Sequence, residues 1–135
     1  MVRVGDLTIQ DQAVILPQIF VGSTTRDISL ASGTQAITGV GFKPRYVHFS
    51  VCLNATDAFS TGHDSNTGAR KCAYILDKTA GLFYVDTSLS IVVYSSANNG
   101  YLGYISSFDV DGFTITWQKW NSSTGTAQIA FTAFK

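Results

Sequence analysis

Hydrophobic and polar residues alternate along much of this chain. Residues 113–117 read FTITW, with three apolar side chains on one face and two threonines on the other. Residues 45–53 read RYVHFSVCL, in which every second residue from Val47 onward is apolar. A period of two is what a β-strand with one buried face requires. We therefore predict strands in both segments, with these side chains facing the core: Phe113, Ile115, Trp117, Val47, Phe49, Val51 and Leu53.

Strand-like segments recur about every 8–12 residues, separated by residues that favour turns. This spacing is typical of a sandwich or barrel. We predict an all-β fold, an antiparallel, jelly-roll-like β-sandwich of about eight strands that forms one domain over residues 23–135. Two polar segments, 54–70 and 95–100, are expected to be loops. The predicted strands are 24–30, 34–40, 45–53, 71–76, 82–85, 89–94, 104–108, 113–117 and 127–134.

Residues 1–22 differ from the rest of the chain. Two short apolar runs lie on either side of Pro17, which cannot donate a hydrogen bond within a sheet. One interpretation is a first strand with a proline at its edge. The other is an N-terminal arm that binds a neighbouring subunit or a partner protein, and both interpretations stay open. The arm would bind through Val14, Ile15, Leu16, Ile19 and Phe20.

The composition agrees with a β-protein and restricts the partners. The chain of 135 residues has no glutamate and 29 serines and threonines, which favours strands and turns over helices. Its formal net charge is zero, so a nucleic-acid partner is not expected. Charged residues make up only 13%, and such a surface defends poorly against self-association. We expect a homo-oligomer, with a trimer as one option. Neither a signal peptide nor a membrane span is expected.

Candidate catalytic and metal-binding groups are few. The segment Asp109–Gly112 reads DVDG, which resembles the start of a calcium loop, but the glutamate that closes such a loop is missing. A hairpin turn with Gly112 in the left-handed conformation is the favoured interpretation. The two histidines, His48 and His63, lie in no arrangement typical of a hydrolase or a zinc site. We predict a protein that is not an enzyme and has no metal or cofactor.

The two cysteines, Cys52 and Cys72, could form one disulfide in an oxidising compartment. Both lie in apolar, strand-like runs, where a free cysteine behaves as a small buried hydrophobe. Free thiols are therefore the favoured interpretation.

Aromatic residues offer a site for sugars, because the C–H faces of a sugar stack on aromatic rings. Packing in the core or between subunits is the alternative for each of them. Trp120, at the end of a predicted strand, is the strongest candidate. The predicted glycan-binding set is Trp120, Tyr101 and His63.

Two segments together carry a resemblance to a known family. They are GFKPRYVHF at 41–49 and SFDVDGFTITW at 107–117, the second followed by a closing AQIAFTAFK. In this order they resemble a small β-sandwich domain of virion proteins from tailed bacteriophages and prophages. The resemblance implies a structural protein that is not an enzyme, either a capsid decoration protein or a small tail or fibre component. It would be made in the host cytoplasm and located in the virion, bound to other virion proteins of the capsid or tail.

The same order of segments has a weaker similarity to H-type lectins, β-sandwiches that trimerise and bind sugars. The apolar tail TAQIAFTAF departs from the polar, sugar-contacting end of that family. This similarity implies an alternative function, a carbohydrate-binding module that recognises a host surface glycan.

Overall fold

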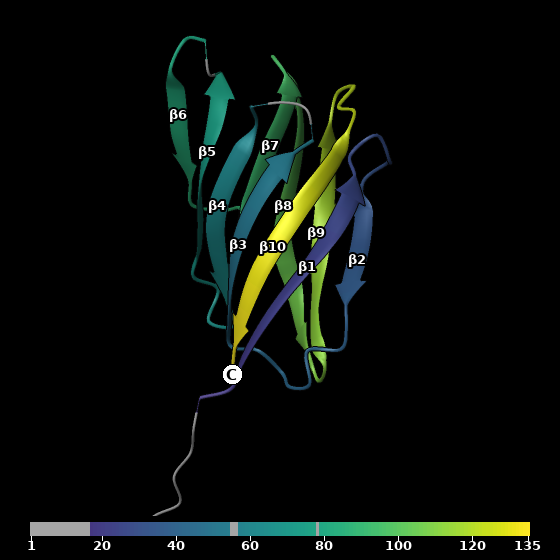
Figure 1. The fold of residues 1–135 in the computed structure, drawn as a ribbon, viewed down its shortest axis with the longest axis vertical. Helices are drawn as coiled ribbons and strands as arrows, with labels where there is room; N and C mark the ends of the chain where they lie inside the picture. The colour runs from purple at the N-terminus through teal and green to yellow at the C-terminus, as the bar shows by residue number, and fades with distance from the viewer. Residues whose placement is uncertain (1–16, 55–56, 78) are drawn as a thin grey trace, which may run out of the picture.

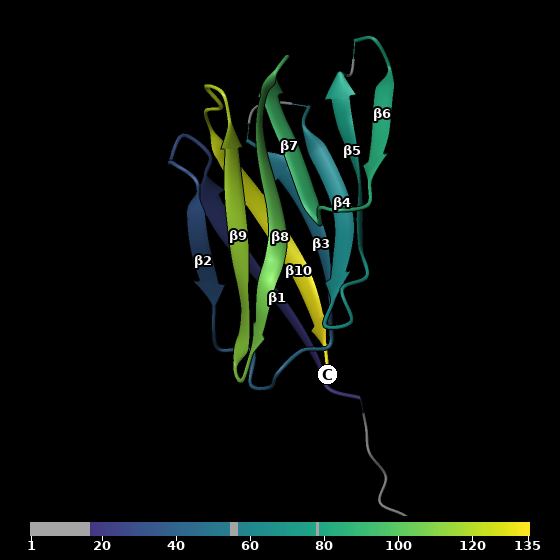
Figure 2. The same cartoon turned by 180° about the vertical axis from the view of Figure 1, so that it is seen from behind.

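The structure is a computed structural model that describes residues 17–54, 57–77 and 79–135. These residues form ten strands in two antiparallel sheets that pack face to face, which confirms the all-β sandwich (Figure 1, Figure 2). The larger sheet has the order β1-β10-β3-β4-β5-β6. Its strands are β1 (Ile19–Asp27), β3 (Tyr46–Leu53), β4 (Phe59–Ser65), β5 (Arg70–Asp77), β6 (Leu82–Asp86) and β10 (Thr126–Phe134).

The smaller sheet has the order β2-β9-β8-β7. Its strands are β2 (Gly33–Ile37), β7 (Ile91–Ser96), β8 (Asn99–Asp109) and β9 (Gly112–Trp120). Consecutive hairpins build most of both sheets, β3 to β6 in one and β7 to β9 in the other. The nested pairing of a jelly roll is seen only at one side, where β1 pairs with β10 and β2 pairs with β9. The four-stranded sheet is too narrow to cover six strands, and β6 stands beyond it in both views (Figure 1, Figure 2).

The core lies between the sheets and is built by the predicted alternation. All seven side chains predicted to face inward are at most 2% exposed. Aromatic rings join the two sheets, since Phe113 of β9 lies 5.9 Å from Phe49 of β3 and 5.2 Å from Phe131 of β10 between ring centroids. Burial of these side chains is worth roughly 1.5–3 kcal/mol each. The periodicity of the sequence therefore identifies the faces that stabilise the fold.

The prediction of a loop over residues 54–70 is wrong. It contains β4, which lies between β3 and β5 inside the larger sheet. The inward residues of β4 are Ser60, Gly62 and Asp64, all buried although none is a large hydrophobe. At Gly62 the opposite sheet comes very close, because a Cβ added at this position would lie 2.1 Å from the carbonyl oxygen of Ser90. Close backbone packing thus takes the place of apolar side chains in this strand.

The second predicted loop, 95–100, is also shorter than expected. Strand β7 runs to Ser96 and β8 begins at Asn99, so two residues make the turn. Asn98 adopts a φ of 62°, a left-handed conformation that asparagine tolerates well.

The DVDG segment forms the turn between β8 and β9, as predicted. Gly112 has a φ of 155°, and a Cβ there would lie 1.9 Å from the carbonyl oxygen of Ile37. The carboxylate of Asp111 accepts hydrogen bonds from the backbone N–H groups of Gly39 and Gly41 at 2.9 and 2.6 Å. These bonds hold the pKa of Asp111 below its usual value. Asp111 therefore ties the hairpin to the segment after β2.

Candidate functional site

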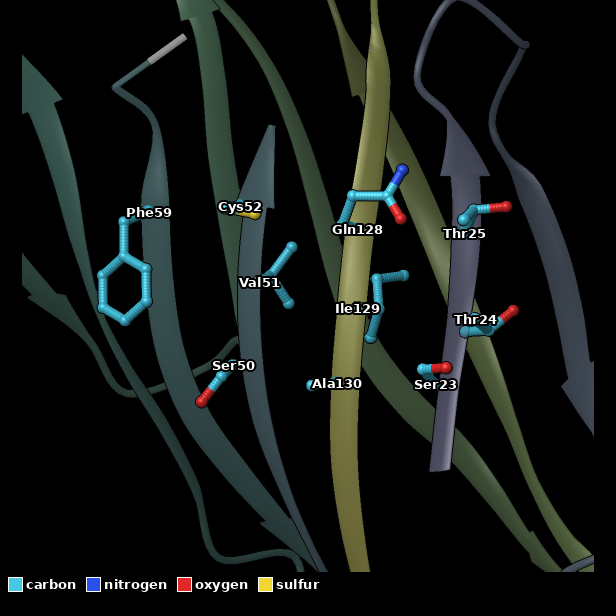
Figure 3. Close-up of a pocket in the computed structure, with 10 residues that line it drawn as sticks. All are labelled: Ser23, Thr24, Thr25, Ser50, Val51, Cys52, Phe59, Gln128, Ile129 and Ala130. Atoms are coloured by element: carbon cyan, nitrogen blue, oxygen red, sulfur yellow. The ribbon is translucent and has the colours of Figure 1, made fainter. Parts of the chain in front are cut away.

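A shallow groove crosses the outer face of the larger sheet, over β1, β10, β3 and β4 (Figure 3). Its volume is about 560 Å³. Antiparallel register aligns Thr25, Gln128, Cys52 and Phe59 in one row across these strands. The lining residues are Ser23, Thr24, Thr25, Ser50, Val51, Cys52, Phe59, Gln128, Ile129 and Ala130.

The chemistry of the groove is neutral. No charged side chain is among the residues that line it, and its polar groups are the hydroxyls of Ser23, Thr24, Thr25 and Ser50, the thiol of Cys52 and the amide of Gln128. Phe59, at one end of the groove, is 44% exposed. Such a surface can exchange hydrogen bonds with a ligand, and the Phe59 ring can stack on an apolar face of that ligand. These properties suit an uncharged polar ligand.

The edge strand β6 carries the longest run of consecutive exposed large hydrophobic residues among the described residues. Its residues Leu82, Phe83, Tyr84 and Val85 follow one another and are 40%, 70%, 45% and 66% exposed. The side chain of Phe83 also joins a hollow of about 190 Å³, lined by Phe59, Thr61, Ala73, Tyr74, Ile75 and Phe83. A run of exposed apolar residues on an unpaired edge is normally avoided in proteins that stay monomeric.

The opposite edge of the sheet, β1, also presents apolar side chains. Ile19 is 55% exposed and Val21 is 75% exposed. Phe20 points the other way, and its ring centroid lies 6.0 Å from that of Phe131 at the border of the core. Ile19 and Phe20 therefore belong to a first strand paired with β10. The other predicted arm residues, Val14, Ile15 and Leu16, lie outside the described residues.

A basic hollow of about 450 Å³ lies beside the start of β1. It is lined by Pro17, Gln18, Lys43, Pro44, Arg45, Asn66 and Lys135. Three cationic side chains in one hollow favour an anionic group on whatever occupies it.

The prediction that Tyr101 binds glycans is wrong, because this residue is fully buried. Its hydroxyl donates to the carbonyl oxygen of Ala31 at 3.1 Å. The same hydroxyl accepts hydrogen bonds from Arg26, at 2.8 Å from Nη2 and 3.1 Å from Nε. The tyrosine ring packs on Trp117 with centroids 5.4 Å apart. Tyr101 is therefore a core residue whose polar end is capped by an arginine.

The other two glycan candidates lie in different parts of the sandwich. Trp120 ends β9 with 46% exposure. His63 lies in β4 of the larger sheet, not in a loop, and its ring stacks on Tyr46 with centroids 5.5 Å apart. It stands directly opposite His48. The structure therefore does not bring Trp120, Tyr101 and His63 together.

Instead, the structure places Trp120 in a row of aromatic rings that joins both sheets. Trp120 lies 6.1 Å from Tyr94, Tyr94 lies 6.0 Å from Tyr74, and Tyr74 lies 6.1 Å from Tyr84, all between ring centroids. Burial raises the pKa of Tyr74 and Tyr94. Alternation alone could not find this row, because its members come from four separate strands.

Both cysteines are free. Cys72 is buried as expected, and its burial, helped by the charge of Asp86, raises the pKa of the thiol to about 12. The expectation that Cys52 is buried is wrong, since it lies exposed in the groove. It shares the outer face of β3 with Ser50, because every second residue of that strand points away from the core.

No family model, curated protein or solved structure matches this chain. Within residues 17–54, 57–77 and 79–135, no group of three or more metal-ligating side chains could hold an ion. The same residues contain no helix that is long and apolar enough to cross a membrane.

Proposed function

We propose that this protein is a structural protein of a tailed-phage particle, which acts without catalysis by binding other virion proteins. The observation that carries the proposal is that both edges of the larger sheet end in exposed apolar strands. Unpaired edges template further pairing, so soluble monomers usually protect them with charges, prolines or bulges. Exposed apolar groups of this kind mark interaction surfaces. A component of a repeated assembly would have both edges covered.

The phage assignment comes from the segments 41–49 and 107–117. They contribute side chains to the core between the sheets, including Phe49 of β3, Phe113 of β9 and Phe42 of the connection between β2 and β3. The resemblance therefore concerns residues that build the sandwich. It supports a role in the capsid shell or in a small tail component.

We assign the virion partner to the β1 edge. Ile19 and Val21 supply the apolar contact, and the basic hollow with Lys43 and Arg45 lies beside it. We expect the partner surface to carry apolar side chains and carboxylates. Burial of one valine contributes roughly 1.5–3 kcal/mol, which corresponds to a tenfold or larger change in affinity.

The test replaces Val21 with lysine in the full chain. Particles are purified from a host that supplies either the wild type or the variant, and the copies per particle are measured by quantitative mass spectrometry. We expect Val21→Lys to lower the occupancy at least tenfold at limiting expression. Val110→Lys is the matched control, because Val110 is 85% exposed and lies in the β8–β9 turn, outside both edge strands. Equal occupancy of Val21→Lys and the wild type would contradict this assignment, and absence of the wild type from particles would contradict the function.

The second candidate function is carbohydrate binding, which the neutral groove favours. Hydroxyl and amide groups with one exposed ring, Phe59, are suited to a neutral oligosaccharide. A glycan array should then show saturable binding that Phe59→Ala weakens about tenfold. If Trp120→Ala lowers binding and Phe59→Ala does not, the sugar occupies the end of β9 instead. An array without binding to bacterial polysaccharides would count against this function.

A further inference from the structure

Strand β6 is exposed on both faces and along its free edge. Phe83 and Val85 lie on the outer face of the sheet, and Leu82 and Tyr84 lie on the inner face. The inner face is open because the smaller sheet ends at β7 (Figure 2). Among the described residues, β5 is the only strand that pairs with β6. The outer face, the inner face and the free edge of β6 are therefore all accessible to a partner.

We propose that β6 is the self-association surface of this protein, where two copies pair their β6 strands antiparallel around a two-fold axis at Tyr84. The two larger sheets would then join into one continuous sheet. Addition of a strand to an exposed edge satisfies unpaired backbone groups and lets side chains of both faces make contact. The β6 edge lies opposite the β1 edge, so this proposal and the proposed function can fail independently.

The sequence of β6 is suited to pairing with itself. An antiparallel two-fold at Tyr84 places Phe83 opposite Val85 of the second copy on the outer face, twice by symmetry. Pairs of an aromatic and a β-branched residue directly opposite each other stabilise sheets by roughly 0.2–1 kcal/mol. The two Tyr84 side chains meet on the inner face. An isologous contact of this kind closes at two copies and does not propagate into a fibre.

Charge does not oppose this pairing. Asp86 is the one charged residue of β6. Its partner in the proposed register is Leu82, so the two Asp86 residues lie about 13 Å apart along the strands. This separation exceeds the Debye length of about 8 Å at physiological salt. The Asp86 carboxylate also keeps its hydrogen bonds from the N–H and hydroxyl of Ser88, at 2.6 and 2.8 Å.

The buried area indicates a weak dimer. Aromatic side chains bury roughly 150–250 Å² when fully covered. Complete coverage of the exposed area of Leu82, Phe83, Tyr84 and Val85 in both copies would bury on the order of 1,000 Å² at most. This value is at the lower limit of specific interfaces. We therefore expect a dissociation constant on the order of micromolar, which a multivalent assembly would strengthen.

We take a second copy as the occupant because its β6 offers the matching pair of Phe83 and Val85. The chain's own N-terminal segment is the alternative, and it precedes β1, which lies at the opposite edge of the sheet, five strand spacings or about 24 Å from β6 (Figure 1). The same segment of a neighbouring copy remains a competing occupant, which the experiment distinguishes.

The first experiment is sedimentation velocity on the full chain from about 1 to 500 μM, a range that brackets a micromolar constant. We expect the wild type to change from monomer to dimer across this range. Val85→Lys should raise the dissociation constant at least tenfold, because a lysine on an edge strand blocks further pairing. Val110→Lys should dimerise as the wild type does. A monomeric wild type throughout, or a Val85→Lys variant that dimerises normally, would overturn the proposal.

The second experiment tests the register with complementary charges. Phe83→Lys and Val85→Asp should each be monomeric alone, and their mixture should form a heterodimer in which the introduced lysine of one copy faces the introduced aspartate of the other. Circular dichroism and thermal unfolding check that both variants fold. Lack of association in the mixture would refute the two-fold register. If the triple variant Val14→Ser, Ile15→Ser, Leu16→Ser abolishes dimerisation and Val85→Lys does not, the N-terminal segment is the occupant and the proposal is wrong.

Discussion

The buried carboxylate of Asp64 should be among the most sensitive positions of the fold. It lies in β4 with no exposure to solvent and bridges the two sheets. Its Oδ2 accepts hydrogen bonds from the Ser90 hydroxyl at 2.7 Å and from the Ile105 N–H at 2.9 Å. Arg70 Nε lies 3.1 Å from the same oxygen, but its N–H is not aligned, so this contact is an ion pair without a hydrogen bond.

Two opposing contributions determine how much the Asp64 carboxylate stabilises the fold. Oδ1 of Asp64 is buried without a hydrogen-bond partner, which costs about 1–3 kcal/mol and offsets part of the gain at Oδ2. Alanine removes the unsatisfied Oδ1, but it also leaves the Ser90 hydroxyl and the Ile105 N–H without their acceptor. The partly buried charge of Arg70 then has no carboxylate beside it. Arg70 keeps a hydrogen bond to the Ile105 carbonyl oxygen at 3.0 Å and packs over the Tyr104 ring at 4.8 Å. Removal of one partner from a buried ion pair typically destabilises a protein by about 3–5 kcal/mol.

We therefore expect Asp64→Ala to lower the free energy of unfolding by about 3–5 kcal/mol. With a urea m-value of about 2 kcal/mol/M, the unfolding midpoint should fall by roughly 2 M. Asp64→Asn keeps one acceptor oxygen and should lose less. Lys71→Ala, exposed on the neighbouring strand, is the control and should change stability by less than about 0.5 kcal/mol. A loss below about 1 kcal/mol for Asp64→Ala would show that the cost of burying the Asp64 carboxylate cancels the gain from its hydrogen bonds and its ion pair. The expectation that this carboxylate stabilises the fold would then be wrong.

Three further predictions test the packing and the titrating groups. Gly62→Ala should cost about 3 kcal/mol or more in urea unfolding, because its Cβ would lie 2.1 Å from a backbone oxygen of the facing sheet; a loss under about 1 kcal/mol would contradict this close approach. The lowered pKa of Asp111 stabilises the folded state at neutral pH. The stability gap between wild type and Asp111→Asn should thus persist down to about pH 4 and close as the pH falls through the folded-state pKa, and a gap unchanged at pH 2 would argue against this origin. At pH 8, iodoacetamide should modify Cys52 rapidly and Cys72 only after unfolding, since burial raises the Cys72 pKa to about 12; equal rates in mass spectrometry would exclude the buried position.

Alternation of residue types was enough to predict the strands whose buried face is apolar. Every second residue of 47–53 and of 113–117 faces the core as expected, because a strand's own period decides which side chains share a face. The turn at Asp109–Gly112 was likewise predictable, since the residues that favour a turn are contiguous in the chain, whereas the contact between Gly112 and the Ile37 carbonyl oxygen was not. The two free cysteines were expected, although only one of them is buried.

Features that depend on the opposite sheet could not be predicted. Strand β4 reads as a polar loop because its buried positions are a serine, a glycine and an aspartate. The hydrogen-bond partners of Asp64 are Ser90 and Ile105, which lie 26 and 41 residues away from it along the chain. Tyr101 likewise has the pattern of a strand aromatic, and only the position of Arg26 shows that its hydroxyl is enclosed. The alternation of apolar and polar residues shows which side chains of a strand share a face, but not which other part of the protein covers that face.

Strand β6 shows this limit most clearly. The sequence predicts a short strand over 82–85, and its four consecutive apolar residues, LFYV, do not indicate which face is covered. Alternation therefore determined the all-β fold and the faces of its central strands, because these depend on neighbours in the chain. The tertiary structure decided that a six-stranded sheet faces a four-stranded one, which leaves β6 without cover. The exposure of a side chain depends on what lies opposite to it, and here that is determined by sheet width, which no local pattern contains.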